Sequence, residues 1–172
     1  LYFVLGKLMN WASPSMFVHD RGLRWLLVAA GSYGAYALGA NNVANVTGPF
    51  VGPGMLSPTT ACAIGALSIA LGVITYSKNV MFTVGRDLVK LDAFSAFVAC
   101  WAEAVTVHVY ARIGVPVSTS QAIVGAVLGV GLVKGMRTIR LATLGKILFG
   151  WVGTPSISAG VAFLLLKLFL FL

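Results

Sequence analysis

Charged residues are scarce in this sequence. Only 9% of its 172 residues are Asp, Glu, Lys or Arg, whereas 59% are hydrophobic. A soluble domain carries about a quarter charged residues, because it needs them at its surface. Several apolar runs reach roughly 20 residues, the length that crosses a bilayer as a helix. The composition excludes an ordinary soluble domain and predicts an all-α integral membrane protein.

Patterns typical of enzymes and metal centres are missing. The two cysteines, Cys62 and Cys100, lie in apolar runs without metal-ligand spacing, which predicts packing residues. We find no nucleophile–base constellation and no phosphate loop with its lysine, so we expect neither an enzyme nor a cofactor. The net charge of +8 comes from basic residues spaced singly between apolar runs, a pattern untypical of nucleic-acid binding.

Apolar runs and helix breakers divide the chain. Residues 1–20 are expected to hold the tail of a preceding helix (1–9) and part of a polar loop (10–21), and residues 21–172 to form one membrane domain. The predicted spans are approximately 22–47, closed by Gly48-Pro49, then 58–76, 93–113, 118–133 and 141–172. Residues 118–133 are short for a crossing and suit a half-helix or re-entrant segment. Pro155 is expected to kink or split the last span, and residues 78–92 to form an amphipathic interfacial helix. Because Leu1 is not a start residue, we expect a piece of a longer polypeptide.

The basic residues indicate an orientation. If the first span begins inside the cell and residues 118–133 return there, most basic residues fall in loops on that side. They are Lys7, Arg21, Arg24, Lys78, Arg86, Lys90, Lys134, Arg137 and Arg140. Cytoplasmic loops carry such an excess, which predicts a multi-pass protein of the cell membrane with its basic loops in the cytoplasm.

Three asparagines lie near the end of the first predicted span. Asn41 and Asn45 share a face of the expected helix, and Asn42 flanks them. Unpaired amides are costly in hydrocarbon, so these side chains must line a polar cavity or face partner helices. A single asparagine commonly joins membrane helices, but three so close together favour a binding site.

A second polar stretch follows the third predicted span. Pro116 breaks that span, and Ser118, Thr119, Ser120 and Gln121 then begin a new helix. One interpretation is an ordinary N-cap, for which one hydroxyl suffices. The other is an anion site, built from free backbone N–H groups, the positive end of the helix dipole and the hydroxyl donors. Placement at the depth of the asparagines favours the anion site.

Glu103 lies in the middle of a predicted span, with Thr106 and Tyr110 on the same helix face. A carboxylate at this depth needs a partner, a cation or a proton. It is therefore a candidate for binding an ion or for a structural ion pair. His108 lies about 140° round the helix from Glu103, so the two do not form a pair, and we expect an interfacial histidine.

The two polar stretches resemble the signatures of the inorganic phosphate transporter (PiT) family, which includes related sulfate permeases. The family pattern Gly-Ala-Asn-Asp-x-x-Asn matches residues 39–45, except that Asn42 stands in place of Asp. The pattern Pro-(Val/Ile)-Ser-Thr-(Thr/Ser)-His-x-x-Val-Gly matches residues 116–125, except that Gln121 stands in place of His. Family members also have a glutamate in the middle of a span between these two patterns, which matches Glu103. A Trp-Val-x-x-Pro pattern in their last helix resembles residues 151–155. The resemblance extends from about residue 21 to the last residue.

This resemblance implies secondary active transport of inorganic phosphate, as symport with sodium ions or protons. Family members contain two inverted repeats with broken helices, and this chain resembles one repeat, most like the C-terminal one. The second repeat, or another copy of this chain, is then an expected partner. The implied substrate ligands are Asn41, Asn42, Asn45, Ser118, Thr119, Ser120 and Gln121, and the implied coupling-ion residues are Glu103 and Asn42.

The two departures from the family pattern leave alternatives open. Asn42 and Gln121 donate hydrogen bonds to an anion but do not take up the proton of monohydrogen phosphate, which favours sulfate as an alternative substrate. Asn42 also removes a negative ligand for sodium, although its amide oxygen can still bind the ion. An alternative of another class is a structural membrane subunit without transport activity, in which the amides and hydroxyls only join helices.

Overall fold

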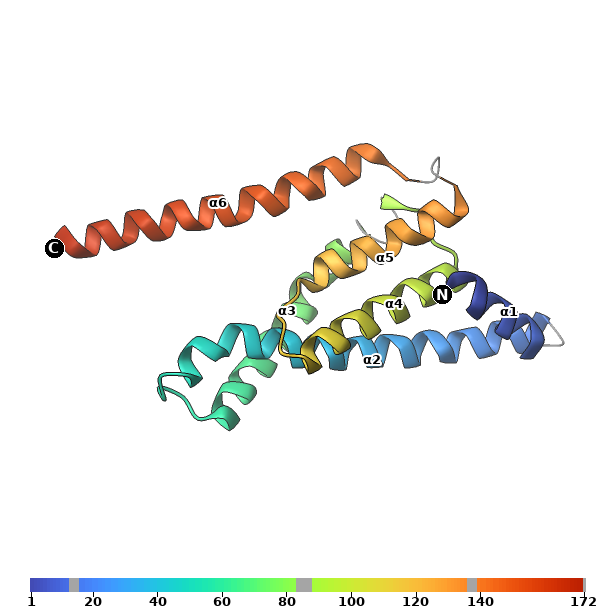
Figure 1. Ribbon diagram of the computed structural model, residues 1–172, viewed down its shortest axis with the longest axis horizontal. Coiled ribbons are helices and arrows are strands. Elements are labelled where there is room, and N and C mark those ends of the chain that lie inside the picture. Colours follow the sequence, from blue (N-terminus) through green and yellow to red (C-terminus); the bar gives the residue numbers. More distant parts are fainter. Residues whose placement is uncertain (13–15, 83–87, 136–138, 172) are drawn as a thin grey trace. The chain divides into compact units, whose positions relative to one another are not determined.

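The computed structural model describes residues 1–12, 16–82, 88–135 and 139–171 of the chain. These residues form the helices α1 (Tyr2–Ala12), α2 (Met16–Val51), α3 (Pro58–Phe82), α4 (Ala93–Arg112), α5 (Thr119–Lys134) and α6 (Leu141–Phe171) (Figure 1). The chain divides into two compact units, residues 1–139 and 140–172. Within the described ranges there is no strand, so the predicted all-α class is confirmed.

Three described segments are long and apolar enough to cross a membrane: Pro58–Asn79 of α3, Ala93–Arg112 of α4 and Leu141–Phe171 of α6. The longest of them, α6, has no buried residue in its own unit. Such apolar surface is stable only against lipid or other membrane helices. The predicted span 22–47 is not among the three, because glycine, tyrosine and asparagine lower the hydropathy of α2. The length and composition of these helices are those of an integral membrane protein.

Small residues bring α2 and α4 together. Ala30 and Ala37 of α2 and Ala104 of α4 are all fully buried. A Cβ added to Gly34 would lie 3.7 Å from the Cβ of Ala104 and 3.4 Å from Oε2 of Glu103. Small side chains at this spacing let two helix backbones approach closely, as is common within membranes. The two helices run side by side in the same direction (Figure 1).

Gly114 ends α4 and sets the turn into α5. Its φ of +74° is strained for residues with a side chain, which favours glycine here. The N–H of Gly114 donates to the carbonyl of Ala111 at 3.3 Å, and that of Val115 to the carbonyl of Tyr110 at 3.0 Å. These two bonds form a Schellman motif. Pro116 then prevents the helix from resuming at once.

The far end of α5 returns to the start of α4. Lys134, the last residue of α5, forms an ion pair with Asp92 at 2.5 Å. Nearby, Val89 and Ile139 form an isolated antiparallel bridge, and a Cβ added to Gly131 would lie 2.8 Å from a side-chain carbon of Ile139. The segments before α4 and after α5 are thus tied together at one end of the first unit.

Ser57 and Pro58 begin α3. The Ser57 hydroxyl accepts a hydrogen bond from the Thr60 N–H at 3.2 Å, which satisfies one of the free N–H groups of the first turn. Pro58 is favourable at this position because it has no N–H to satisfy. Further along, α3 packs on α2, where Gly65 faces Val43.

The predicted polar loop over residues 10–21 is wrong. The helix α1 continues to Ala12 and α2 already begins at Met16, so only residues 13–15, which include Pro14, lie outside the described residues. Polar side chains such as Asp20 and Arg21 are exposed at the start of α2. Exposed polar residues at a helix end keep their hydration and do not terminate the helix.

The predicted interfacial helix over residues 78–92 lies partly outside the described residues, and its last residues are not helical. Residues 78–82 continue α3, residues 83–87 lie outside the described ranges, and residues 90–92 are not helical. Leu88 and Val89 are buried within the first unit. Burying these two apolar side chains against protein is more favourable in free energy than placing them at a membrane surface.

Two prolines do not end their helices. The helix α2 passes through Pro49 and keeps a bond from the Gly52 N–H to the Gly48 carbonyl at 2.9 Å, so the predicted stop at Gly48-Pro49 is wrong. The turn that ends α2 contains Gly54 with φ of +78°. Likewise α6 is one helix with Pro155 inside it, so it is not split. Each proline removes one helical hydrogen bond, which a long helix tolerates.

Candidate functional site

Asn41 joins the two polar stretches, which lie 76 residues apart in sequence. Its amide nitrogen Nδ2 donates to the Val117 carbonyl at 2.8 Å, and the Val117 N–H donates to its oxygen Oδ1 at 3.4 Å. The α4–α5 turn is therefore bound by both its donor and its acceptor to α2. The expectation that the two stretches meet in the fold is confirmed.

Asn41 also binds its neighbour. Nδ2 donates a second hydrogen bond to Oδ1 of Asn42 at 3.0 Å. Asn41 is only 3% exposed, so this amide is buried and satisfied by protein groups. Asn42 is half-buried and Asn45 is exposed. The three asparagines thus have different surroundings, although all lie on α2.

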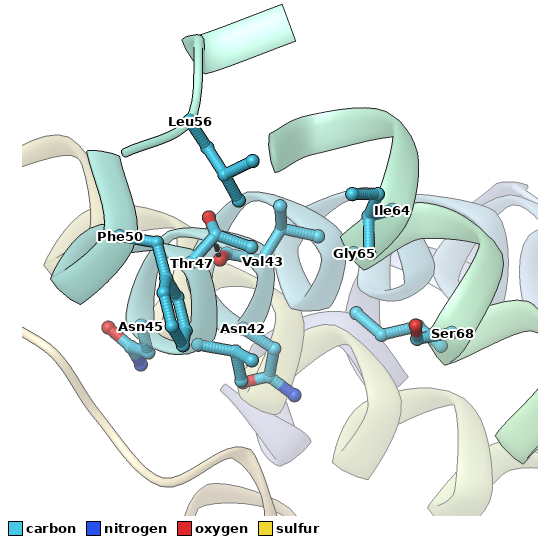
Figure 2. A pocket seen from close by; sticks show the side chains of 11 residues that line it. Asn42, Val43, Asn45, Thr47, Phe50, Leu56, Ile64, Gly65 and Ser68 are labelled. Atoms are coloured by element: carbon cyan, nitrogen blue, oxygen red, sulfur yellow. Dashed lines mark hydrogen bonds between the residues drawn. The ribbon is translucent and has the colours of Figure 1, made fainter. Parts of the chain in front are cut away.

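A pocket of about 540 Å³ lies between the last turns of α2, the α2–α3 loop and α3 (Figure 2). Its polar lining consists of Asn42, Asn45 and Thr47 from α2 and Ser68 from α3. The remaining lining residues are Val43, Val46, Phe50, Leu56, Ile64, Gly65 and Ile69. The Thr47 hydroxyl donates to the Val43 carbonyl at 2.7 Å, so its proton is already bound within α2.

A second cavity of about 100 Å³ lies where α2 meets the α4–α5 turn. Its lining residues are Ala40, Asn41, Ala44, Asn45, Ala111, Gly114, Val115 and Pro116. Asn45 lines both cavities. It is therefore the one asparagine of the motif that faces both α3 and the turn before α5.

Ser118 caps α5. Its backbone is extended, with φ of −80° and ψ of 112°, and its hydroxyl accepts from the Gln121 N–H at 3.3 Å. The ordinary N-cap interpretation therefore applies to the Ser118 hydroxyl. Ser120 and Gln121 are exposed at the same helix end, and Thr119 is half-buried. That these four residues bind an anion stays a prediction.

Glu103 lies apart from the asparagines. Its half-buried carboxylate is beside Gly34, two turns of α2 before Asn41, or roughly 10 Å along the helix. No ion-pair partner of this carboxylate occurs in the described part of the chain. The His108 ring instead lies 5.5 Å from that of Tyr33. Across the described ranges, no three His, Cys, Asp or Glu residues are grouped as metal ligands.

Three features of the structure have no signature in the sequence. The partner of Asn41 is the peptide group of Val117, and a backbone group carries no side-chain signature. Ser68 lines the pocket from α3, where its spacing in an apolar run matches any packing serine. The Asp92–Lys134 pair joins residues 42 positions apart. Taken singly, each of them is an ordinary charged residue at a helix end, so the sequence does not indicate the pairing.

Relatives of this chain are named as permeases. It is 35% identical to a protein of Methanocaldococcus jannaschii over 143 residues, which cover 83% of this chain and 46% of that protein. It is 34% identical to one of Pyrococcus horikoshii over 158 residues, 86% of this chain and 39% of the relative. A third relative, from Haemophilus influenzae, is 37% identical over 133 residues, which cover 70% of this chain and 31% of the relative. All three carry the name "Putative phosphate permease".

The chain spans less than half the length of these relatives. No solved structure matches it. A family model described as the phosphate transporter family matches residues 10–162, which include both polar stretches and Glu103. This is a family of transporters and not of enzymes. The chain therefore belongs to the phosphate transporter family.

Proposed function

We propose that the protein transports inorganic phosphate across the cell membrane by secondary active transport. The observation that carries this proposal is the pair of hydrogen bonds between Asn41 and Val117, which joins the two family motifs into one structural element. Membership of the phosphate transporter family and the names of the relatives support phosphate as the substrate. The comparisons give sulfate no such support.

Neutral donors suit a phosphate ion that must be both bound and released. Asn42 and Asn45 offer amide N–H groups at the pocket, and Thr119, Ser120 and Gln121 lie at the positive end of the α5 dipole. These groups replace part of the hydration of the anion without adding a fixed positive charge. In a low-dielectric surrounding, a lysine or arginine would hold a dianion far more tightly and slow its release.

The proposed coupling site is Glu103. Its carboxylate lies between α2 and α4, and a buried carboxylate is stabilised by a sodium ion or a proton. Uptake of that cation offsets part of the charge of the phosphate that crosses with it. Asn42 remains the alternative sodium ligand through its amide oxygen. We expect Glu103→Gln to abolish the dependence of uptake on the cation gradient.

The proposed architecture is one repeat of a transporter that acts with a second repeat or with another copy of this chain. The helices α2 and α4 run in the same direction, and α5 returns to Asp92 at the start of α4. Basic residues therefore gather at one end of the first unit: Arg21, Arg24, Lys90 and Lys134. We assign this basic end to the cytoplasm. Alternating access would then arise by movement of this repeat against its partner about the shared site.

Uptake of radiolabelled phosphate into proteoliposomes tests the proposal. The protein is reconstituted in its complete form, and uptake is measured with and without an inward sodium gradient and an inward proton gradient. We expect one gradient to stimulate phosphate uptake and a tenfold excess of sulfate to leave it unchanged. Sulfate uptake that phosphate inhibits only weakly would contradict the proposed substrate.

The same assay distinguishes a transporter from a structural subunit. We expect Asn45→Ala and Ser120→Ala to reduce uptake while the protein remains assembled, as judged by size-exclusion chromatography. Loss of assembly in both variants, with no uptake by the wild type, would favour the structural role.

A further inference from the structure

The hydrogen bonds of Asn41 determine what Asn42 presents to the pocket. The Asn41 amide has two N–H groups, and one donates to the Val117 carbonyl and the other to Oδ1 of Asn42. The reverse orientation of the Asn41 amide would place its oxygen against the Val117 carbonyl and its nitrogen against the Val117 N–H. The Val117 peptide group therefore fixes which end of the Asn41 amide is the donor.

The orientation of Asn42 follows from that of Asn41. Because Asn41 donates to it, the oxygen of the Asn42 amide must face Asn41, and its NH₂ group must point away. Asn42 lines the pocket of about 540 Å³ (Figure 2). Its NH₂ group therefore offers donors at the pocket, which attract the oxygens of an anion.

We propose that Asn41 is a positioning residue, which fixes Asn42 as a hydrogen-bond donor to the transported oxyanion. The inference rests on the proposed function and refines it, because it assigns Asn42 to the anion and leaves Glu103 as the coupling residue. An aspartate at position 42 would accept the same bond from Asn41 with one oxygen and present its other oxygen to the pocket. The asparagine thus replaces an acceptor and a negative charge by a donor.

A double-mutant cycle on phosphate uptake tests the role of Asn41. Asn41→Ala is expected to raise the KM for phosphate about tenfold in the wild type but less than about twofold in an Asn42→Ala background, because Asn41 acts through Asn42. Thr75→Val is the matched control, since its hydroxyl bonds only to the carbonyls of its own helix. Equal effects in both backgrounds would overturn the proposal.

A second variant leaves Asn41 unchanged, so this test does not require the protein to fold without the Asn41 side chain. Asn42→Asp keeps an acceptor for Asn41 but places a carboxylate oxygen in the pocket. We expect it to raise the KM for phosphate at least tenfold and to make phosphate binding dependent on added sodium. A KM within twofold of wild type would overturn the proposal. Absence of phosphate uptake by the wild type itself would instead contradict the proposed function.

Discussion

Gly65 allows α3 to pack closely against α2 beside the pocket. A Cβ at this position would lie 2.9 Å from Cγ1 and 3.3 Å from Cγ2 of Val43, and 3.5 Å from Cγ2 of Thr47. Val43 is β-branched and has little freedom to rotate within a helix. In Gly65→Ala the helix α3 must therefore move away from α2 by a few tenths of an ångström.

The expected cost follows from two opposing contributions. Overpacking of a close contact costs about 1–3 kcal/mol. Replacing glycine by alanine within a helix offsets about 1 kcal/mol of this. The net loss is then roughly 1 kcal/mol, and the melting temperature of a domain of this size falls by about 2–4 °C for each kcal/mol.

Gly72→Ala is the matched control for this substitution. Gly72 lies on nearly the same face of α3, two turns further along, and a Cβ there would meet nothing within 4 Å. It should leave stability unchanged or raise it, because only the gain in helix propensity applies. Thermal unfolding of the purified protein in detergent measures both variants. A Gly65→Ala protein as stable as Gly72→Ala would refute the packing argument.

Three further predictions concern the two ends of α5. Burial raises the pKa of Asp92, but hydrogen bonds to its carboxylate, the largest from Lys134, and the positive charge of Lys134 together outweigh burial and hold the pKa below its ordinary value of 3.8. Because the folded-state pKa is lowered, the ion pair stabilises fully above the ordinary value. The difference in melting temperature between wild type and Asp92→Asn should shrink below that value and vanish once the pH has fallen through the lower, folded-state pKa. Because Asp92 is 58% exposed, the pair contributes less than about 1 kcal/mol. Gly131→Ala should destabilise the protein by roughly 1 kcal/mol net, because its Cβ meets Ile139 and the gain in helix propensity offsets only part of that cost. Gly129→Ala, with nothing within 4 Å of its Cβ, should not destabilise it, and equal melting temperatures would contradict this. Ser118→Ala should cost about 1 kcal/mol by loss of the α5 cap, and Ser118→Gly only a few tenths; chemical unfolding in detergent compares them.

The helices and the meeting of the two motifs could be predicted from the sequence. Apolar runs separated by glycine and proline predict α4 to α6 within one residue, and the start but not the end of α3, because hydrocarbon imposes helical hydrogen bonding on any spanning segment. The asparagines near the end of α2 required polar partners at their depth, and the turn before Ser118 supplied the nearest candidate. That much follows from the cost of burying an amide.

The individual contacts could not be predicted. The sequence does not show that Asn41 binds a backbone group of Val117 while Asn45 faces open cavities, since all three asparagines have the same chemistry. The helical course of residues 16–21 was missed because exposed polar residues are compatible with both a loop and a helix end. The burial of Leu88 and Val89 depends on packing partners brought together only in the fold.

Phosphate binding to the purified, complete protein tests the central claim most directly, namely that the asparagine motif and the start of α5 form one phosphate site. Equilibrium binding of radiolabelled phosphate is compared for wild type, Asn45→Ala, Ser120→Ala and the control Thr75→Val. We expect each of the first two substitutions to weaken binding about tenfold, the equivalent of roughly 1.4 kcal/mol, while the melting temperature stays unchanged and the control binds as the wild type does. Binding of wild-type strength in both Asn45→Ala and Ser120→Ala would contradict it.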